Sequence, residues 1–252
     1  MVKDSFNIPP DLVQVLRSAR RVAALSGAGI SAESGVPTFR EAQTGLWSRY
    51  SSEELATPAA FQRDPRLVWE WYAWRRELTT SAQPNPGHLA LVEMERRIPQ
   101  FTLITQNVDG LHRRAGSHKI LELHGNLQRI KCMDEGHPVE RWKDDDQIPP
   151  RCPKCGGLLR PDVVWFGENL PVETLQAAWD AAEAAEVFFS IGTSTIVEPA
   201  ASLPFVAHRH GAAVIEVNLH ETPLTRLAAY SLRGPSGLVL PALIQATWGS
   251  PN

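Results

Sequence analysis

Apolar residues along the chain form short continuous runs that alternate with stretches of helical spacing. The runs, each typical of a buried strand, cover residues 22–25, 101–105, 120–123, 187–191 and 213–217. Helical spacing covers residues 11–19, 65–78, 87–97, 171–185, 200–210 and 238–247. Strands that alternate with helices predict an α/β fold with a parallel sheet covered on both faces.

Two stretches break this alternation. Residues 41–82 do not form strand–helix repeats as a whole. Residues 125–161 hold all three cysteines, an acidic cluster at 144–146 and the pair Pro149-Pro150. We expect the second stretch to be a small insert that needs an organiser of its own.

Composition and charge narrow the class of function. The 25 basic and 28 acidic residues give a net charge of −3, so no basic excess indicates nucleic-acid binding. With 43% apolar and 21% charged residues, the 252-residue chain can build a core, and disorder is excluded. We find neither a run of 18 apolar residues nor the apolar region of a signal peptide. We therefore expect a cytoplasmic protein with no nucleic-acid or membrane partner.

A glycine-rich turn follows the first predicted strand. Residues 27–32, GAGISA, fit the pattern G-x-G-x-x-[G/A], in which glycines bring backbone N–H groups close to a pyrophosphate. Pro37 lies too close for a long helix to follow, and no acidic residue ends a second strand about twenty residues on. The turn is therefore either an ordinary glycine turn or a nucleotide site unlike that of a standard dehydrogenase.

Polar residues also follow four of the predicted strands. Each alone is compatible with a turn or a cap, but the carboxyl ends of parallel strands meet at one edge of a sheet, where ligands bind. Together with the glycine turn they predict one binding crevice. These residues are Gln106, Asn107 and Asp109, then His124, then Gly192, Thr193 and Ser194, and finally Asn218.

Seven motifs resemble, in sequence and in order, those of the sirtuin family of NAD-dependent protein lysine deacylases. They are GAGISAESGVPTFR (27–40), TQNVDGLH (105–112), LHGN (123–126), a CxxC pair (152–155), VVWFGE (163–168), IGTS (191–194) and VIEVN (214–218). The resemblance implies a doubly wound, Rossmann-like large domain and a smaller inserted lobe of zinc-ribbon type plus helices. On this chain the large domain would cover residues 1–40, 83–124 and 162–252, and the small domain 41–82 and 125–161.

The resemblance also implies which residues bind NAD. A loop closes over the dinucleotide, Gln106 lies by the ribose on the nicotinamide side, and Asp109 with Ile30 holds the carboxamide. The remaining implied contacts are Gly27, Ala28, Gly29, Phe39 and Arg40 in the loop, and Gly192, Thr193, Ser194, Asn218 and Ser236 around the adenosine half.

The implied reaction begins when the amide oxygen of an acyl-lysine attacks the anomeric carbon as nicotinamide leaves. Asn107 would lie near the reacting centre, and His124 would act as general base on a ribose hydroxyl. An unperturbed histidine pKa near 6.5 suits that role at pH 7. The products would be free lysine, nicotinamide and O-acyl-ADP-ribose. A lone histidine has a structural role more often, so the catalytic assignment depends on the motif around it.

Two further motifs bear on the acyl-lysine substrate. Val164, Trp165, Phe166 and Gly167 resemble a family segment that, with residues 196–198, sandwiches the peptide by strand addition, although both aromatic residues can equally be core. Tyr72 and Arg75, three apart, share a helix face and resemble the pair of the desuccinylase branch, which binds succinyl or malonyl groups. Ala56 fits the same branch. In the alternative, the helix is simply amphipathic, and Arg75 and Arg76 are solvated or paired with Glu70 or Glu77.

The sequence is compatible with three functions. The first is a deacylase that prefers acidic acyl groups and also accepts acetyl. The second is a general deacetylase that carries Tyr72 and Arg75 incidentally. The third is a non-catalytic NAD or ADP-ribose binding module, against which His124 and Asn107 count, because a binder needs no base. ADP-ribosyl transfer is a further possibility. Protein substrates and the oligomeric state cannot be read from the sequence.

The cysteines Cys132, Cys152 and Cys155 resemble a structural zinc site that has lost one ligand. A four-cysteine site has the pattern C-x2-C-x15–20-C-x2-C. Cys152 and Cys155 form one half, and Cys132 begins the other, but Glu135 stands where its partner belongs. Zinc also accepts carboxylate and imidazole. Glu135, Asp134 or His137 could complete the site, or the site could be empty.

Overall fold

The computed structural model describes residues 6–37, 50–142 and 147–249. Its main feature is a six-stranded sheet in the order β3-β2-β1-β6-β7-β8, with every neighbouring pair parallel. The strands are β1 (Arg21–Ser26), β2 (Gln100–Thr105), β3 (Ile120–Glu122), β6 (Val187–Ile191), β7 (Ala213–Asn218) and β8 (Tyr230–Arg233). The predicted α/β class and parallel sheet are confirmed. The strand order reverses between β1 and β6, which is where such sheets bind ligands.

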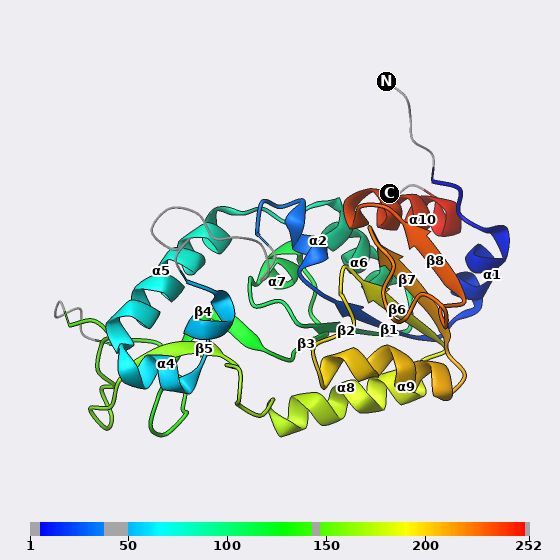
Figure 1. Cartoon of the computed structure of the whole chain (residues 1–252). Coiled ribbons are helices and arrows are strands. Elements are labelled where there is room, and N and C mark those ends of the chain that lie inside the picture. The colour runs from blue at the N-terminus through cyan, green and yellow to red at the C-terminus, as the bar shows by residue number, and fades with distance from the viewer. Residues whose placement is uncertain (1–5, 38–49, 143–146, 250–252) are drawn as a thin grey trace.

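Helices cover both faces of this sheet (Figure 1). Because side chains alternate along a strand, Ala24 and Phe189 enter one core and Ala23 and Phe188 the other. The first core is completed by α1 (Pro10–Ser18), α6 (Pro86–Arg97) and α10 (Ser236–Trp248), and the second by α8 (Val172–Ala184), the 3-10 turn Ala200–Ser202 and α9 (Leu203–Arg209). Two short helices, α2 (Gly29–Ala32) and α7 (Leu111–Ala115), follow strands β1 and β2.

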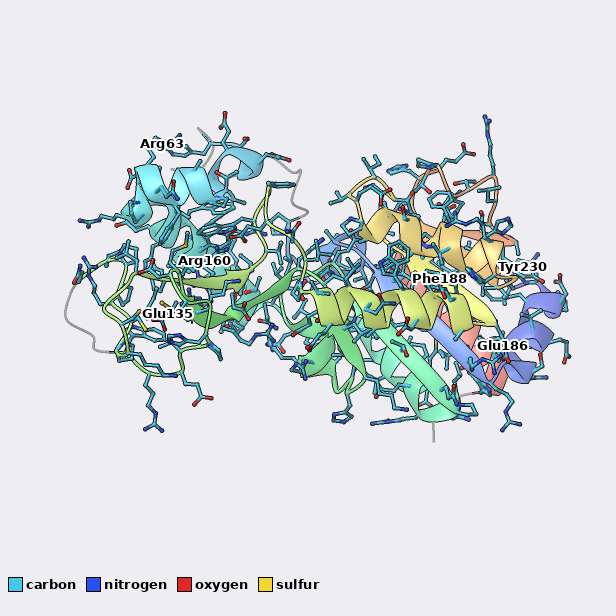
Figure 2. The ribbon with its side chains drawn as sticks, turned by 90° about the horizontal axis from the view of Figure 1, so that it is seen from below. Arg63, Glu135, Arg160, Glu186, Phe188 and Tyr230 are labelled. Atoms are coloured by element: carbon cyan, nitrogen blue, oxygen red, sulfur yellow. The ribbon has the colours of Figure 1, made fainter. Side chains whose placement is uncertain are left out.

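The remaining helices and strands of the described chain form a separate small lobe. It holds the antiparallel pair β4 (Gly125–Cys132) and β5 (Leu159–Val163) and the helices α3 (Ser52–Leu55), α4 (Pro58–Arg63) and α5 (Pro65–Ser81). Two cores of its own fill it, one around Trp71 and Trp165 and one around Cys132 and Cys152. Figure 2 shows Arg160 and Glu135 in this lobe, apart from Phe188 in the large sheet.

The start of α5 is encoded locally. The Asp64 side chain accepts a hydrogen bond from the backbone N–H of Leu67 (3.0 Å), and Pro65 occupies the first helical turn. An aspartate N-cap followed by proline is a strong start signal, since both satisfy or remove otherwise unpaired N–H groups. Tyr72 and Arg75 both lie on the helix that begins in this way.

No helix among the described residues has the length and apolar character needed to span a membrane.

Candidate functional site

The turn after β1 packs directly against the turn after β6. The Gly29 N–H donates to the Gly192 carbonyl (2.8 Å), and that of Gly27 donates to the Ile191 carbonyl (2.9 Å). A Cβ added to Gly29 would lie 2.7 Å from the Gly192 Cα, closer than real Cβ atoms come. The glycine pattern is therefore required for two strand ends to meet. As Pro37 predicted, only the four-residue helix α2 follows.

The polar residues predicted at the strand ends converge at this switch point. The Gln106 amide donates to the Thr193 hydroxyl (2.9 Å), and the Asn218 amide donates to the Thr193 carbonyl (2.8 Å). The Asn107 amide donates to the Gly27 carbonyl and to the Ser31 hydroxyl, both at 3.1 Å. Strands β1, β2, β6 and β7 thus contribute to one cluster of neutral amides and hydroxyls. Such a donor set fits the hydroxyl and amide groups of a dinucleotide.

A buried polar network continues below this cluster. The Ser31 hydroxyl donates to Asp109 (2.7 Å), which also accepts from the Leu111 N–H (2.8 Å). Burial raises the pKa of Asp109 above its ordinary value, and these hydrogen bonds oppose the shift. Ile30 is fully buried alongside. The structure therefore brings Ile30 and Asp109 to the same side of the switch point as Asn107.

Sequence reasoning missed two buried histidines in this network. The rings of His88 and His112 lie 4.8 Å apart, His88 Nε2 lies 3.4 Å from the Ser31 hydroxyl, and His112 Nε2 lies 2.8 Å from the Ser26 hydroxyl. Burial lowers the pKa of His88 to about 4 and that of His112 well below its ordinary value, so both are neutral at pH 7. Among the described residues, none hydrogen-bonds to Nδ1 of His112. A histidine inside the otherwise apolar face of α6 was the available signal.

His124 lies just after β3, half-buried, with its Nδ1 3.0 Å from the Gln106 carbonyl oxygen. A carbonyl only accepts, so Nδ1 carries the proton and Nε2 keeps its lone pair. Burial lowers the His124 pKa, and the hydrogen bond to Gln106 partly offsets that shift. The geometry therefore gives a neutral imidazole whose Nε2 can accept a proton at pH 7.

Tyr72 and Arg75 both lie on α5, as predicted, and both side chains pack at Trp71: the Arg75 guanidinium carbon is 5.0 Å from the centre of the Trp71 ring, and the Tyr72 ring centre is 4.5 Å from it. Tyr72 is buried, and its hydroxyl accepts a hydrogen bond from the indole N–H of Trp165 (3.0 Å). Burial raises the Tyr72 pKa to about 12, with the Arg75 charge acting in the opposite direction. Burial also lowers the Arg75 pKa, and attraction to Tyr72 and Asp109 opposes this. The Arg75 charge on α5 thus acts on the pKa of Asp109, which follows β2.

The segment 163–168 leads from β5 toward the large sheet. The Val164 N–H donates to the His124 carbonyl, and the Phe166 N–H donates to the Ala56 carbonyl, both at 2.9 Å. Trp165 is 1% exposed, whereas Phe166 is 44% exposed and Gly167 turns the chain with a φ of 88°. The two aromatic residues thus differ: Trp165 is a core residue, and Phe166 presents apolar surface two residues after Val164, whose backbone bonds to His124.

Two sequence-predicted NAD contacts, Phe39 and Arg40, lie outside the described residues. Ser236 begins α10 and is buried. The neighbouring Gly237 N–H donates to the Glu33 carboxylate (2.8 Å), which ties α10 to the segment after the glycine turn. Ser236 therefore lies within reach of that segment rather than in a distant part of the fold.

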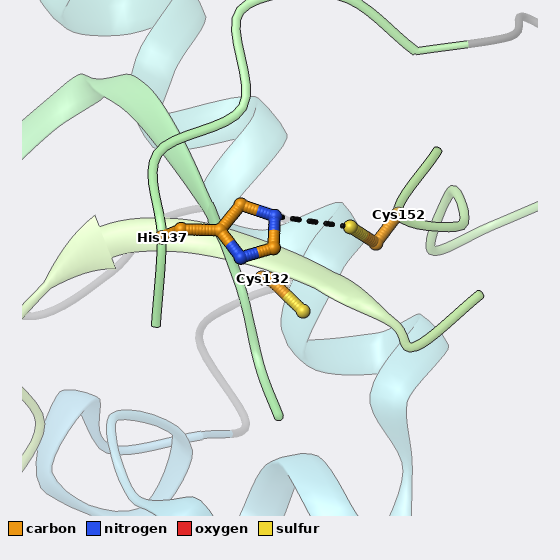
Figure 3. A group of neighbouring side chains, drawn as sticks. All are labelled: Cys132, His137 and Cys152. Atoms are coloured by element: carbon orange, nitrogen blue, oxygen red, sulfur yellow. Dashed lines mark hydrogen bonds between the residues drawn. The ribbon is translucent and has the colours of Figure 1, made fainter. Parts of the chain in front are cut away.

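The cysteines form a cluster in the small lobe. The ligand atoms of Cys132, His137 and Cys152 all lie within 4.8 Å of one another. His137 Nε2 is 3.3 Å from the Cys152 sulfur (Figure 3). The Cys155 sulfur is 3.4 Å from that of Cys132. Three thiols and one imidazole form a donor set that fits a tetrahedral zinc ion.

Of the three alternatives for the missing ligand, the structure brings His137 to the sulfurs. Residues 132–137 form a tight hairpin in which the Cys132 N–H donates to the His137 carbonyl (3.0 Å), so the histidine lies opposite the cysteine. Glu135 instead lies 3.3 Å from His137 Nδ1, on the far side of the ring. Counting along the CxxC frame pointed to position 135, because that count ignores the hairpin.

The chain resembles known proteins over nearly its whole length. The family model described as the Sir2 family matches residues 27–199. An NAD-dependent protein deacylase of Aquifex aeolicus is 58% identical over 82% of this chain and 87% of the relative, and one from Pyrococcus furiosus is 48% identical over 93% and 96%. A Sir2 homologue solved with NAD superimposes with a TM-score of 0.89 at 48% identity, covering 96% of this chain and 95% of that one.

Proposed function

This chain belongs to the Sir2 family and is an NAD-dependent protein deacylase, and we propose that it prefers acyl-lysines whose acyl group ends in a carboxylate. Succinyl and malonyl are the groups meant, with acetyl accepted more weakly. The observation that carries the proposal is that the buried Tyr72 and the guanidinium of Arg75 both pack at the Trp71 ring, with the Arg75 charge acting on the pKa of Tyr72 and of Asp109. An acyl chain that entered between α5 and β2 would meet both groups.

The chemistry of the pair favours an anionic partner. Because the Tyr72 pKa is raised to about 12, the phenol stays protonated and can donate at any physiological pH. A guanidinium keeps its charge in proteins and pairs with a carboxylate through two N–H groups. Hydrogen bonds to a charged group strengthen where water is excluded. A neutral acetyl group makes neither contact, so it gains nothing from the pair.

We assign the reaction roles as follows. NAD, the consumed co-substrate, supplies an anomeric carbon that accepts the amide oxygen when nicotinamide leaves. Asn107 orients the reacting groups through its amide, and Gln106 and Asn218 hold hydroxyls of the two riboses. His124, with its proton on Nδ1, accepts a proton at Nε2 from a ribose hydroxyl. The product class is O-acyl-ADP-ribose, and a Sir2 homologue with 49% identity has been solved with 2'-O-acetyl ADP ribose.

We further propose that the glycine turn and the β6 turn hold the NAD phosphates and adenosine. The residues assigned to this task are Gly27, Ala28, Gly29, Gly192, Thr193, Ser194 and Ser236, with Ile30 and Asp109 at the carboxamide; Phe39 and Arg40 remain assigned from the sequence alone. The neutral donor set at the switch point supports the assignment, because NAD offers many hydroxyl and amide partners there.

The peptide would lie against Phe166 and residues 196–197. Ile196 is 58% exposed and Val197 37%, so both present apolar surface as Phe166 does. Strand addition uses backbone hydrogen bonds and tolerates many sequences. A Sir2 protein with 31% identity has been solved with a p53 peptide and NAD, which supports a peptide substrate here.

In the small domain, proposed as residues 41–82 and 125–161, we assign a structural zinc to Cys132, Cys152, Cys155 and His137. The ion would tie the two cysteine turns together. The ion takes no part in the reaction. Its ligands belong to the small-lobe core around Cys132 and Cys152, whereas His124 follows β3 of the large sheet.

The test of the acyl preference compares succinyl-, malonyl- and acetyl-lysine peptides of one sequence on wild type and on Arg75→Met. Methionine keeps the length and packing of the side chain and removes its charge. We expect wild type to favour the acidic groups in kcat/KM and Arg75→Met to lose at least tenfold of that preference. An unchanged succinyl-to-acetyl ratio in the variant would favour the general deacetylase instead.

A further inference from the structure

The Tyr72 hydroxyl has a fixed role in its contact with Trp165. An indole N–H can only donate, so in the 3.0 Å contact the hydroxyl oxygen accepts. The hydroxyl proton must then point elsewhere. Within the described part of the chain, this accepted hydrogen bond is the single one that the Tyr72 side chain makes. A buried hydroxyl proton that is not used in this contact requires an acceptor, and an acyl carboxylate is one that can only accept.

The indole itself is held from several sides. The Arg160 guanidinium carbon lies 3.2 Å from the centre of the Trp165 ring, and the Phe61 ring centre lies at 5.3 Å. Arg160 is in turn bound to both carboxylate oxygens of Glu168 and to the Val163 carbonyl (2.8 Å). Side chains fixed in this way lose little further freedom when a ligand binds. The indole N–H therefore meets the tyrosine from one direction only.

Trp165 also belongs to the segment that we assign to peptide binding. Its backbone N–H donates to Glu168 (2.8 Å), while its neighbours Val164 and Phe166 bond to the carbonyls of His124 and Ala56. One residue thus joins the backbone near His124 to the hydroxyl on α5. A shift of this segment would move the hydrogen-bond donor of Tyr72 as well.

We propose that Trp165 is a positioning residue for acyl selection: its indole N–H orients the Tyr72 hydroxyl so that the phenolic proton is presented to the acyl carboxylate. The inference rests on the acidic acyl preference proposed above and adds a residue that touches neither NAD nor the acyl group. Packing in the core needs only the ring of Trp165, whereas this role needs its N–H group.

The competing explanation is that Trp165 only fills the core, so the test must separate the N–H from the ring. Trp165→Phe keeps an aromatic ring near Arg160 and Phe61 and removes the N–H. Benzothienylalanine at position 165 goes further, because sulfur replaces the N–H in a ring of the same shape. The matched control is Trp179→Phe, a half-buried tryptophan on α8 in the second core of the large sheet.

The measurement is kcat/KM for three peptides that carry succinyl-lysine, its terminal amide analogue and acetyl-lysine. We expect both Trp165 variants to lose about tenfold more activity on succinyl than on acetyl, mainly through a higher KM. The amide analogue should follow acetyl, and Trp179→Phe should keep the wild-type ratios. In a Tyr72→Phe background, Trp165→Phe should leave the succinyl-to-acetyl ratio unchanged, because the hydroxyl that it orients is gone.

The outcomes separate the two proposals. If wild type prefers succinyl and Arg75→Met abolishes this while both Trp165 variants retain it, the positioning role is wrong and the acyl preference stands. An equal loss on all three peptides would also overturn the inference, since it would reveal a packing role. If wild type shows no acidic preference at all, the proposed function and this inference fall together.

Discussion

At His124 the backbone decides which ring nitrogen can act as a base. The Gln106 carbonyl holds the Nδ1 proton, so Nε2 is the free acceptor. A glutamine or an asparagine at position 124 would present an amide that cannot take up a proton at neutral pH. The hydrogen bond thus specifies the tautomer, and burial specifies the charge state.

The His124 pKa sets the expected acid limb of the pH–rate profile. Because burial lowers this pKa below 6.5, the neutral form persists to more acidic pH than in a free histidine. We expect kcat/KM to fall on acidification with a midpoint below 6.5, measured on a succinyl peptide at saturating NAD. Tryptophan fluorescence at each pH serves as the control for unfolding. A midpoint at or above 6.5 in the folded enzyme would contradict this assignment.

The sequence identified residues that lie in continuous motifs and missed those that meet only in three dimensions. His124, Asn107 and Asp109 stand directly after predicted strands, so the topology alone brings them together. His88 and His112 come from two separate helices, and their contact depends on how α6 packs beside α7. His137 was one of three alternatives, because linear spacing cannot show that a hairpin folds position 137 back onto Cys132.

The hairpin of residues 132–137, which brings His137 to the cysteine sulfurs, predicts which variants lose the metal. We expect wild type to carry about one zinc per chain and His137→Ala to lose most of it under mild chelation. Glu135→Gln should still load, with an affinity lower by about 10- to 100-fold, because Glu135 only supports the far ring nitrogen. Elemental analysis and competition with a chelator measure both.

Two results would contradict this ligand set. If Glu135→Gln loses zinc and His137→Ala keeps it, the carboxylate is the fourth ligand. Wild type with under a tenth of an equivalent of zinc would mean that the site is empty. Elemental analysis and chelator competition do not depend on enzyme activity, so the zinc content of an inactive variant can also be measured.

Strands of the small lobe could not be predicted for identifiable reasons. β5 contains Pro161, which normally argues against a strand, but the proline pairs opposite Ile130, next to a register shift in β4. β4 carries the exposed side chains of Gln128 and Arg129 in its middle. In the large sheet, the edge strand β8 also escaped prediction, because it spans only Tyr230–Arg233. The main helices and the buried strands of the large sheet, by contrast, follow their hydrophobic period closely.

For the whole molecule, the buried neutral histidines predict sensitivity to acid. The pKa of His88 is about 4 when folded and near 6.5 when unfolded, so unfolding takes up a proton between these values. The contribution of His88 to stability is therefore fully present above pH 6.5 and is lost as the pH drops toward 4. His88 alone accounts for a loss on the order of 3 kcal/mol over that range, and His112 adds to it.

Urea unfolding at pH 7, 6, 5 and 4.5 measures this loss. At pH 5, His88→Gln should reduce the proton uptake on unfolding by about one, whatever its effect on stability at pH 7. The exposed His208 on α9 is the matched control, because His208→Gln removes one histidine without touching the buried network. Equal slopes for wild type and His88→Gln between pH 6 and 4.5 would show that His88 is not buried in its neutral form.

A competition between two acylated peptides tests the acidic acyl preference of this NAD-dependent deacylase in a single reaction. Equal concentrations of succinyl- and acetyl-lysine peptides of one sequence are mixed with NAD and the wild-type enzyme, and the early products are quantified by mass spectrometry. We expect more O-succinyl-ADP-ribose than O-acetyl-ADP-ribose among the early products. Equal amounts, or an excess of the acetyl product, would contradict it.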